Sequence, residues 1–264
     1  MPERIRKRNN VNILGEGGKT LIFAHGFGTD QTAWHTVADA FKDSYRIVLY
    51  DNVGGGKTDP SHFSPQKYSQ LEAYANDLLE IADELKLNDA VFIGHSVSGM
   101  IGLLAAVKAP EHFSKCIMVG ASPRYLNDEG YTGGFEQEHL NSFYQAMEMN
   151  YYAWVSGFAS AAMTYPERPE LAQGFAATLS SIRPDIAQSV ARTIFQSDYR
   201  HMLPELKHET LIIQSTNDIA VPQEVGEYLH KHIPNSKLVK VSATGHFPHI
   251  SEPQQIINAL KKFI

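Results

Sequence analysis

A serine, an aspartate and a histidine each follow a short apolar run, and together they could perform nucleophilic catalysis. With their preceding runs they are Ser96 after 90–93, Asp218 after 211–214 and His246 after 237–241. A serine hydroxyl is a poor nucleophile at neutral pH unless a histidine takes its proton and a carboxylate orients that histidine. Loops that follow parallel strands meet at one edge of a sheet. We therefore expect Ser96 to be a nucleophile, His246 its general base and Asp218 the orienting acid.

The residues around Ser96 predict a sharp turn between a strand and a helix. Gly94 and Ser98 lie two positions before and after the serine, and small residues there let the strand and the helix approach each other. A glycine is usual where this chain has Ser98. The pentapeptide alone therefore does not decide the assignment, and the rest of the chain must support it.

A glycine-rich stretch after the apolar run 21–24 could stabilise the charge that such a reaction creates. It reads His25-Gly26-Phe27-Gly28. Attack by serine on an ester produces an oxyanion, which needs N–H donors that are already in place. We expect these donors to be the backbone N–H groups of Phe27 and of Val97, the residue after the serine. The alternative for residues 25–28 is a plain glycine-rich turn.

Other histidines compete for the role of base. His249 is the second choice, but it follows Pro248 and no glycine precedes it. His95 is next to the serine, and we expect it to project to the opposite side of the turn as a structural residue. His230 and His232 are two apart on a predicted helix and do not share a face, so we expect no metal site. The chemistry needs no cofactor either.

The stretch 51–58, Asp-Asn-Val-Gly-Gly-Gly-Lys-Thr, resembles a phosphate-binding loop at its end. A phosphate-binding loop needs glycine where this chain has Asp51. We therefore interpret residues 51–59 as a turn and not as a nucleotide site.

Composition narrows the function classes further. The 264 residues carry a formal net charge of −6, which argues against nucleic-acid binding. We interpret the basic cluster Arg4 to Arg8 as a solvated tail. No apolar run reaches the roughly 18 residues of a membrane span, so we expect a soluble, cytoplasmic protein. We also expect it to be a monomer. The single cysteine, Cys116, lies in an apolar run and is expected to be a buried thiol.

Short apolar runs alternate with helix-like stretches along the chain. Strands are predicted at 21–24, 46–50, 90–93, 115–119, 211–214 and 237–241, each covered on both faces. Helices are predicted at 31–41, 68–85, 97–108, 223–230 and 253–263. This alternation predicts an α/β fold with a doubly wound, mostly parallel sheet.

The stretch 122–200 interrupts this pattern because it contains no convincing strand. Four helices are predicted within it, at 136–149, 151–164, 169–181 and 184–196. We expect a core formed by 1–121 and 201–264, with 122–200 as a helical lid subdomain.

Several stretches resemble one subgroup of the α/β-hydrolases, which holds the bacterial stress-response regulator RsbQ and the plant strigolactone and karrikin receptors. They are 94–98, 122–128 (SPRYLND), 133–136 (GGFE), 183–187 (RPDIA) and 193–198 (TIFQSD). The resemblance covers nearly the whole chain, and Ser98 matches within this subgroup. It implies an α/β-hydrolase fold in which a V-shaped four-helix lid covers a hydrophobic pocket that ends at the serine.

By position, the resemblance also implies which residues line that pocket. They are Phe27, Val97, Tyr125, Phe135, Trp154, Phe158, Phe175, Phe195 and Ile219. Trp154 and Phe158 are four apart and share a helical face. Tyr125 and Trp154 add polar atoms to an otherwise apolar wall.

Two functions follow from this site. The first is a serine hydrolase that acts on a small hydrophobic ester or lactone through an acyl-enzyme. The alternative, implied by the resemblance, is a slow sensor of a butenolide-like ligand that signals to a protein partner. A haloalkane dehalogenase is disfavoured because its nucleophile is an aspartate, and a cofactor-free haloperoxidase is disfavoured by this lid.

Overall fold

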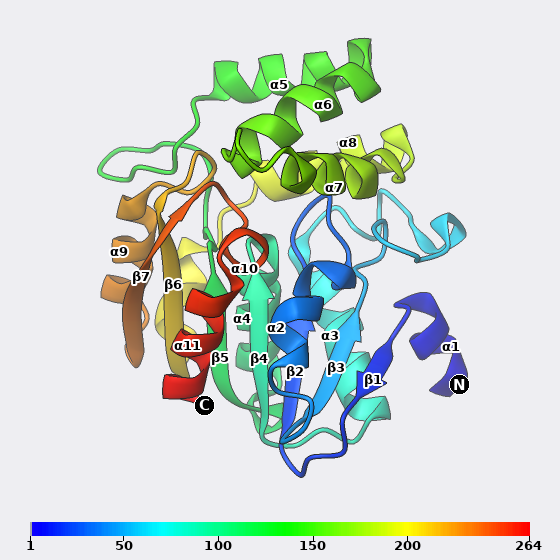
Figure 1. Cartoon of the computed structure of the whole chain (residues 1–264), viewed down its shortest axis with the longest axis vertical. Helices are drawn as coiled ribbons and strands as arrows, with labels where there is room; N and C mark the ends of the chain where they lie inside the picture. Colours follow the sequence, from blue (N-terminus) through cyan, green and yellow to red (C-terminus); the bar gives the residue numbers. More distant parts are fainter. Residues whose placement is uncertain (1) are drawn as a thin grey trace.

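Within residues 2–264, seven strands form one sheet in the order β1-β3-β2-β4-β5-β6-β7 (Figure 1). The computed structural model describes this range, with side chains from residue 5 onward. The strands are β1 (Asn12–Leu14), β2 (Thr20–Ala24), β3 (Arg46–Tyr50), β4 (Ala90–His95), β5 (Phe113–Val119), β6 (Glu209–Asn217) and β7 (Ser236–Thr244). β1 pairs antiparallel with β3, and the other neighbours are parallel. The predicted doubly wound, mostly parallel sheet is confirmed.

The two edge strands differ from the sequence prediction. β1 was not predicted, because three exposed residues leave no apolar pattern to detect. The run 237–241 in β7 was predicted to be covered on both faces, which is wrong: Lys237, Val239 and Lys240 are exposed. β7 pairs only with β6, so one of its sides faces solvent.

Successive side chains of each buried strand point to opposite faces of the sheet, so they contribute to two separate hydrophobic cores. In β2, Ile22 belongs to the core that also holds buried residues of α3 (Leu71–Glu84), α4 (Val97–Lys108) and α9 (Gln223–His232). Its neighbours Leu21 and Phe23 pack on the other face with α2 (His35–Asp39) and α11 (Pro253–Phe263). Because both faces are covered, the strand is fully buried and apolar throughout.

Two helices begin and end at their predicted residues, namely α4 and α11. The predicted helix 31–41 divides into a 3-10 turn (Gln31–Trp34) followed by α2. The predicted helix 68–85 begins only at Leu71, after Gln70 in an extended conformation. A short helix that the sequence did not predict, α10 (Pro248–Ser251), follows β7.

The amino-terminal basic cluster is helical and paired with acidic side chains, so its interpretation as a solvated tail is wrong. Helix α1 (Pro2–Arg8) packs against α3. Arg6 lies 3.0 Å from Glu84, and Arg8 lies 2.7 Å from Glu80. Acidic residues on the outer side of α3 supply these partners. The side chain of Arg4 lies outside the described residues.

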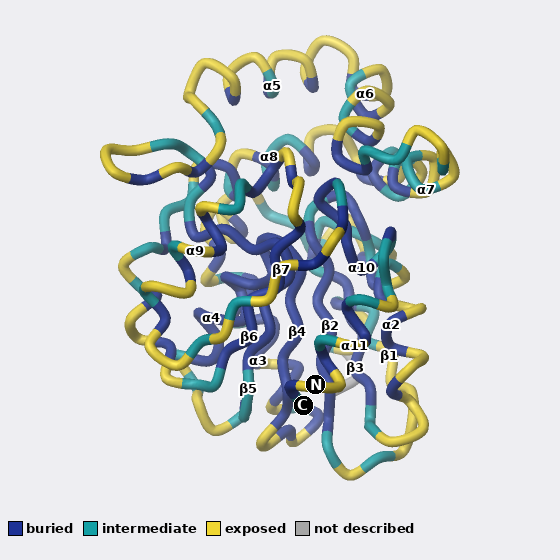
Figure 2. The backbone as a smooth tube through the Cα atoms, turned by 60° about the vertical axis from the view of Figure 1, so that its left-hand side comes forward, coloured by how far each residue is buried: buried dark blue, intermediate teal, exposed yellow. Residues whose placement is uncertain are grey.

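Four helices lie above the edge of the sheet where the parallel strands end (Figure 1). They are α5 (Gln137–Met149), α6 (Tyr151–Met163), α7 (Pro169–Ser180) and α8 (Pro184–Phe195), each within two residues of its prediction. Figure 2 shows α5 largely exposed, whereas the central strands below, such as β2 and β4, are buried. We call α5–α8 the lid. Among residues 2–264, no helix is long and apolar enough to cross a lipid bilayer.

Candidate active site

Ser96 lies at the turn between β4 and α4, in a backbone conformation that few residues other than glycine adopt. Its φ is 55° and its ψ is −125°. The N–H of Ser96 donates to the carbonyl of Val119 over 2.8 Å, which fixes the turn to β5. A Cβ at Gly94 would lie 2.5 Å from the carbonyl oxygen of Ser98, so only glycine lets the strand and helix approach this closely. The strained turn presents the serine hydroxyl above the sheet.

Ser96, His246 and Asp218 form a continuous chain of hydrogen bonds. His246 Nε2 lies 2.8 Å from Ser96 Oγ, and His246 Nδ1 lies 2.8 Å from Asp218 Oδ2. Because an ionised carboxylate can only accept, Nδ1 carries the proton and Nε2 is left to accept from the serine hydroxyl. The structure thus brings the three predicted residues together, and their catalytic role stays a prediction.

Asp218 is held by the loop that follows β6. Its second oxygen, Oδ1, accepts the backbone N–H groups of Ala220 over 2.8 Å and of Val221 over 3.1 Å. The carboxylate side chain is fully buried. These two bonds fix the orientation of the carboxylate and leave Oδ2 free for His246.

His95 and His249 lie behind His246 and not at the serine. His95 Nε2 donates to the backbone carbonyl of His246 over 2.8 Å. The ring of His249 lies between those of Trp34 and His95, with both centroid distances 4.3 Å. Burial lowers the pKa of His95 well below its usual value and that of His249 to about 3. Both rings are therefore neutral, and His249, the second choice for the base, packs against aromatic rings.

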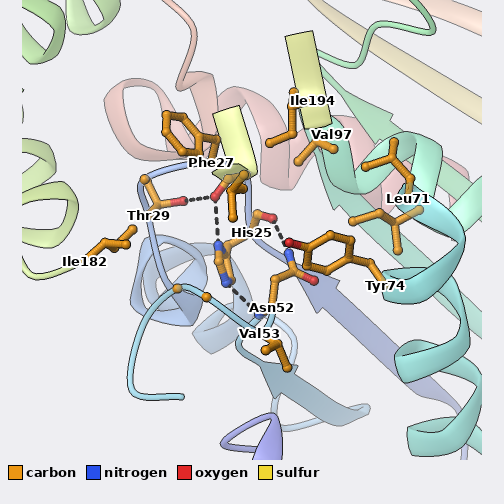
Figure 3. A pocket seen from close by; sticks show the side chains of 16 residues that line it. His25, Phe27, Thr29, Asn52, Val53, Leu71, Tyr74, Val97, Ile182 and Ile194 are labelled. Carbon is orange, nitrogen blue, oxygen red and sulfur yellow. Dashed lines mark hydrogen bonds between the residues drawn. The ribbon is translucent and has the colours of Figure 1, made fainter. Parts of the chain in front are cut away.

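In the loop 25–29, two side chains hold the peptide that joins Gly26 to Phe27 (Figure 3). The carbonyl of Gly26 accepts from His25 Nδ1 over 2.8 Å and from the Thr29 hydroxyl over 3.1 Å. His25 Nε2 in turn accepts the N–H of Asn52 over 3.0 Å, which sets the tautomer of the ring. In a trans peptide the C=O and N–H point in opposite directions. Because His25 and Thr29 hold the Gly26 carbonyl, the Phe27 N–H points away from these two side chains.

Ser98 connects this loop to the turn that carries the serine. Its hydroxyl donates to the carbonyl of His25 over 2.6 Å and accepts from Asn52 Nδ2 over 3.1 Å. A Cβ at Gly26 would lie 2.5 Å from a ring nitrogen of His95, so the loop touches the turn directly. Val97 begins α4, where a helical N–H has no partner within the helix. The predicted oxyanion donors are the N–H groups of Phe27 and Val97. The Ser98 hydroxyl therefore links the loop that carries one donor to the helix that carries the other.

The stretch 51–58 forms a turn organised by Asp51. Its carboxylate accepts the backbone N–H groups of Gln31 over 2.9 Å and of Lys57 over 3.0 Å. Asn10 donates to it as well, over 2.7 Å. This buried carboxylate occupies the position where a phosphate-binding loop needs glycine, which agrees with the interpretation as a turn.

A cavity of about 30 Å³ lies beside the loop 25–29 (Figure 3). Its walls are loops 25–29 and 52–55, Leu71 and Tyr74 of α3, Val97 and Ile101 of α4, and Ile182, Val190 and Ile194 near or on α8. Such a volume holds roughly two water-sized groups. Phe27 and Val97 are the predicted pocket residues that line it.

The other predicted pocket aromatics pack against one another on the lid helices α6, α7 and α8 and on the segment 122–136 that precedes the lid. The closest of these contacts are Tyr125 to Phe195 (5.0 Å), Phe135 to Phe195 (5.6 Å), Trp154 to Phe158 (5.1 Å) and Phe158 to Phe175 (5.9 Å) between ring centroids. The Tyr125 hydroxyl lies 3.3 Å from Ser96 Oγ. Ile219 is instead 47% exposed, because the turn that directs two N–H groups to Asp218 leaves its side chain on the outside.

Sequence reasoning missed four residues of this region. Phe143, which lies on α5, contacts three of the predicted aromatics. The ring centroids of Phe247 and Phe175 lie 4.5 Å apart. Asn52 and Tyr74 line the cavity. Asn52 had a signal, since it lies in the glycine-rich turn 51–58 after β3. Tyr74 and Phe143 had none, because the sequence shows them as ordinary apolar positions of amphipathic helices.

Comparison with known proteins agrees with this architecture. The family described as alpha/beta hydrolase fold matches residues 19–253. The karrikin insensitive 2 receptor CA of Petunia hybrida is 46% identical, over 98% of this chain and 97% of its own. The strigolactone esterase D14 of Arabidopsis thaliana is 44% identical, over 96% and 95%. The solved structure of a hydrolase from Oleispira antarctica has a TM-score of 0.96 and 35% identity, covering 99% of this chain and 96% of that one.

These similarities include every strand of the parallel sheet as well as the lid. The matched range 19–253 contains Ser96, Asp218 and His246. The chain therefore belongs to the alpha/beta hydrolase family.

Proposed function

We propose that this protein is a serine hydrolase for small hydrophobic esters or lactones, with Ser96 as nucleophile. The observation that carries the proposal is the hydrogen-bond chain from Asp218 through His246 to Ser96, with both distances 2.8 Å. A buried carboxylate, an oriented imidazole and a serine on a strained turn are the parts that acyl transfer needs.

The reaction follows from the positions of these groups. Ser96 Oγ attacks the ester carbonyl carbon while its proton passes to His246 Nε2. The N–H groups of Phe27 and Val97 stabilise the negative oxygen, and His246 returns the proton to the departing alcohol or lactone oxygen. Water then loses a proton to His246, attacks the acyl carbon and releases the acid, and Ser96 regains its proton. Asp218 stays ionised and stabilises the imidazolium.

Apolar surroundings support a hydrophobic substrate. Aromatic side chains of the lid pack on Tyr125, which contacts Ser96, and the cavity beside Val97 has mainly aliphatic side chains in its walls. We propose that 122–200 acts as a lid subdomain on a core of 1–121 and 201–264, and that its inner aromatics contact the ligand. The esterase name of the Arabidopsis relative supports an ester or lactone as the reacting group.

A ligand sensor is the second candidate, supported by the Petunia relative that is named a receptor and shares 46% identity. One contact in this chain suits such a role. The backbone N–H of His246 donates to the carbonyl of Ala162 in α6 over 2.8 Å, so the lid is bonded to the loop of the general base. Movement of the lid would signal to a protein partner, while the same three residues react slowly.

Turnover separates the two candidates. The wild type and Ser96→Ala are compared on aryl esters and on butenolides, with rates and melting temperatures recorded. Turnover near 10 per second, lost in Ser96→Ala, is the result expected of a metabolic enzyme. Slow turnover with a ligand-dependent change in melting temperature supports the sensor. Full activity in Ser96→Ala would contradict both.

A further inference from the structure

Tyr125 carries a buried hydroxyl that the mechanism above does not use. The residue is 2% exposed and lies in the segment between β5 and the first lid helix. Its hydroxyl lies 3.3 Å from Ser96 Oγ, which is the hydrogen-bond partner that the described residues give it. Buried hydroxyls need a partner, because an unpaired one costs free energy. The oxygen that satisfies this hydroxyl is therefore the nucleophile itself.

The direction of this hydrogen bond follows from the neighbouring one. A serine hydroxyl has a single hydrogen, and that hydrogen goes to His246 Nε2 over 2.8 Å. Ser96 Oγ can therefore only accept from Tyr125. Burial raises the pKa of the Tyr125 phenol above its usual value, so the hydroxyl keeps its proton at physiological pH. The nucleophile thus accepts from one side chain and donates to the other.

The backbone on both sides of Tyr125 is held in place, so its hydroxyl has a defined position. The carbonyl of Tyr125 accepts the N–H of Phe135 over 3.1 Å. The preceding residue, Arg124, pairs with Asp198 over 3.0 Å, and the two residues also form an isolated β-bridge. The ring of Tyr125 packs on Phe195 with the ring centroids 5.0 Å apart. Segments that precede and follow the lid therefore fix the phenol.

The strength of this hydrogen bond would change during the proposed reaction. In the acyl-enzyme, Ser96 Oγ is an ester oxygen, which is a poorer acceptor than a hydroxyl oxygen. During deacylation water adds to the acyl carbon, and the bond from that carbon to Oγ then breaks. Its electron pair goes to Oγ, which takes a proton from His246, while Tyr125 keeps its own proton. The hydrogen bond is strongest as Oγ gains negative charge, because charged acceptors bind donors more tightly.

Acylation gains less than deacylation from the same contact. The hydrogen bond already exists in the free enzyme, so only its strengthening in the transition state accelerates acylation. Deacylation instead starts from the acyl-enzyme, where the bond is weak, and passes through a state in which the bond is strong. The loss of the Tyr125 hydroxyl is therefore expected to slow deacylation more than acylation.

We propose that Tyr125 is a catalytic residue whose hydroxyl donates to Ser96 Oγ as the serine leaves the acyl group, and that it thereby shortens the lifetime of the acyl-enzyme. The inference rests on the proposed function and adds a residue to its second half. That lifetime also separates a fast hydrolase from a slow sensor, so the same hydroxyl bears on both candidate functions.

Tyr125→Phe tests this role, because it removes the hydroxyl and keeps the ring. 4-Nitrophenyl butanoate has a good leaving group, so deacylation is expected to limit its turnover. We expect the butanoyl group on Ser96 to decay about 10-fold more slowly in the variant, as the loss of one hydrogen bond to a charged oxygen predicts. Rapid-quench mass spectrometry of the intact protein measures this decay. The kcat should fall equally, whereas kcat/KM, which reports acylation, should fall by less than about 3-fold.

Tyr151→Phe is the matched control. Tyr151 is also buried, on α6, and its hydroxyl donates to the carbonyl of Leu179 over 2.7 Å and not to the nucleophile. This variant also loses one buried hydrogen bond and keeps its ring, but the butanoyl group should decay as in wild type. An equally slow decay in both variants would overturn the role of Tyr125. So would equal losses of kcat and kcat/KM in Tyr125→Phe.

Failure of this role is distinguishable from failure of the hydrolase. If wild type cleaves the ester without a butanoyl group on Ser96, and Ser96→Ala is equally active, the proposed function fails and the role of Tyr125 fails with it. If wild type carries the group on Ser96 and Tyr125→Phe loses it equally fast, only the role of Tyr125 is overturned. A longer-lived group in Tyr125→Phe, with little change in kcat/KM, supports the proposal.

Discussion

Ser98 occupies the position where a glycine is usual, and its hydroxyl has a specific task in this structure. It joins the start of α4 to the carbonyl of His25, at the base of the loop that contains Phe27. A glycine could satisfy the close packing against Gly94, but it could not hold this loop. At the scale of single residues, we therefore interpret Ser98 as a positioning residue for the candidate oxyanion hole.

We expect Ser98→Ala to lower kcat by about 3- to 10-fold while KM changes little, because one hydrogen bond that positions an oxyanion donor is lost. Steady-state kinetics on an aryl ester measures both values. Ser114→Ala is the control, since its hydroxyl also donates to a backbone carbonyl but lies at the opposite end of the strands. An equal loss in both variants would rule out the positioning role.

The buried histidine behind the candidate base makes the stability of the fold depend on pH. The pKa of His249 is about 3 in the folded protein because the ring is buried, and about 6.5 in an unfolded chain. Between these values the unfolded state binds more protons, so the folded state loses stability as the pH falls below about 6.5. His95, whose pKa is also lowered, acts in the same direction.

We expect wild type to lose up to about 2 kcal/mol more stability than His249→Phe between pH 7 and pH 5, since one pKa unit corresponds to about 1.4 kcal/mol. Urea unfolding at the two pH values measures the difference. His201→Gln removes an exposed histidine and should behave as wild type. Equal losses in wild type and His249→Phe would show that His249 does not resist protonation.

At the scale of elements, the lid is bonded to the loop that carries His246. The N–H of His246 donates to Ala162, and the Thr244 hydroxyl donates to the carbonyl of Thr164 over 3.4 Å. Gly245 lies between them with a φ of 77°. A Cβ there would collide with the backbone carbonyls of Ala162 and Met163, which cannot yield as a flexible side chain would.

We expect Gly245→Ala to destabilise the protein by about 2–4 kcal/mol, through backbone strain and this collision, and to loosen α6. Urea unfolding and hydrogen exchange over 151–163 measure the two effects. Gly130→Ala is the matched control, because Gly130 has a similar φ of 69° and open space around its Cβ position. Equal destabilisation in both variants would mean that close packing of α6 against Gly245 does not contribute to the effect.

The helices and strands were predictable where their own residues carry an apolar pattern. The buried strands 46–50 and 90–93 and the helix 97–108 consist mostly of apolar residues, so they appear where predicted. β1 and α1 were missed because pairing with β3 and ion pairs with α3 stabilise them. These partners are distant in sequence and leave no local pattern.

The same distinction applies to the candidate site. Ser96, Asp218 and His246 each follow a predicted strand, so fold topology alone brought them to one edge of the sheet. The cavity could not be predicted in this way. It depends on how α3 and α8 pack against two loops, and on Tyr74, which resembles any other buried aromatic of an amphipathic helix.

At the scale of the whole molecule, the sheet and the lid enclose a serine that both proposed functions need. The sheet fixes the strained turn and the hydrogen-bonded pair of Asp218 and His246, and the lid adds aromatic side chains. The hydrolase and the sensor differ in how long an acyl group stays on Ser96 and in whether the lid responds. Covalent capture of that acyl group is thus common to both.

The most direct test is intact-protein mass spectrometry during the first seconds after mixing with 4-nitrophenyl butanoate. The account predicts a mass increase of one butanoyl group, which peptide mapping places on Ser96 and which Ser96→Ala lacks. Ser122→Ala, which alters another buried serine, should still acquire the group. Ester hydrolysis without any adduct in wild type, together with undiminished hydrolysis by Ser96→Ala, would contradict the central claim that Ser96 is the nucleophile.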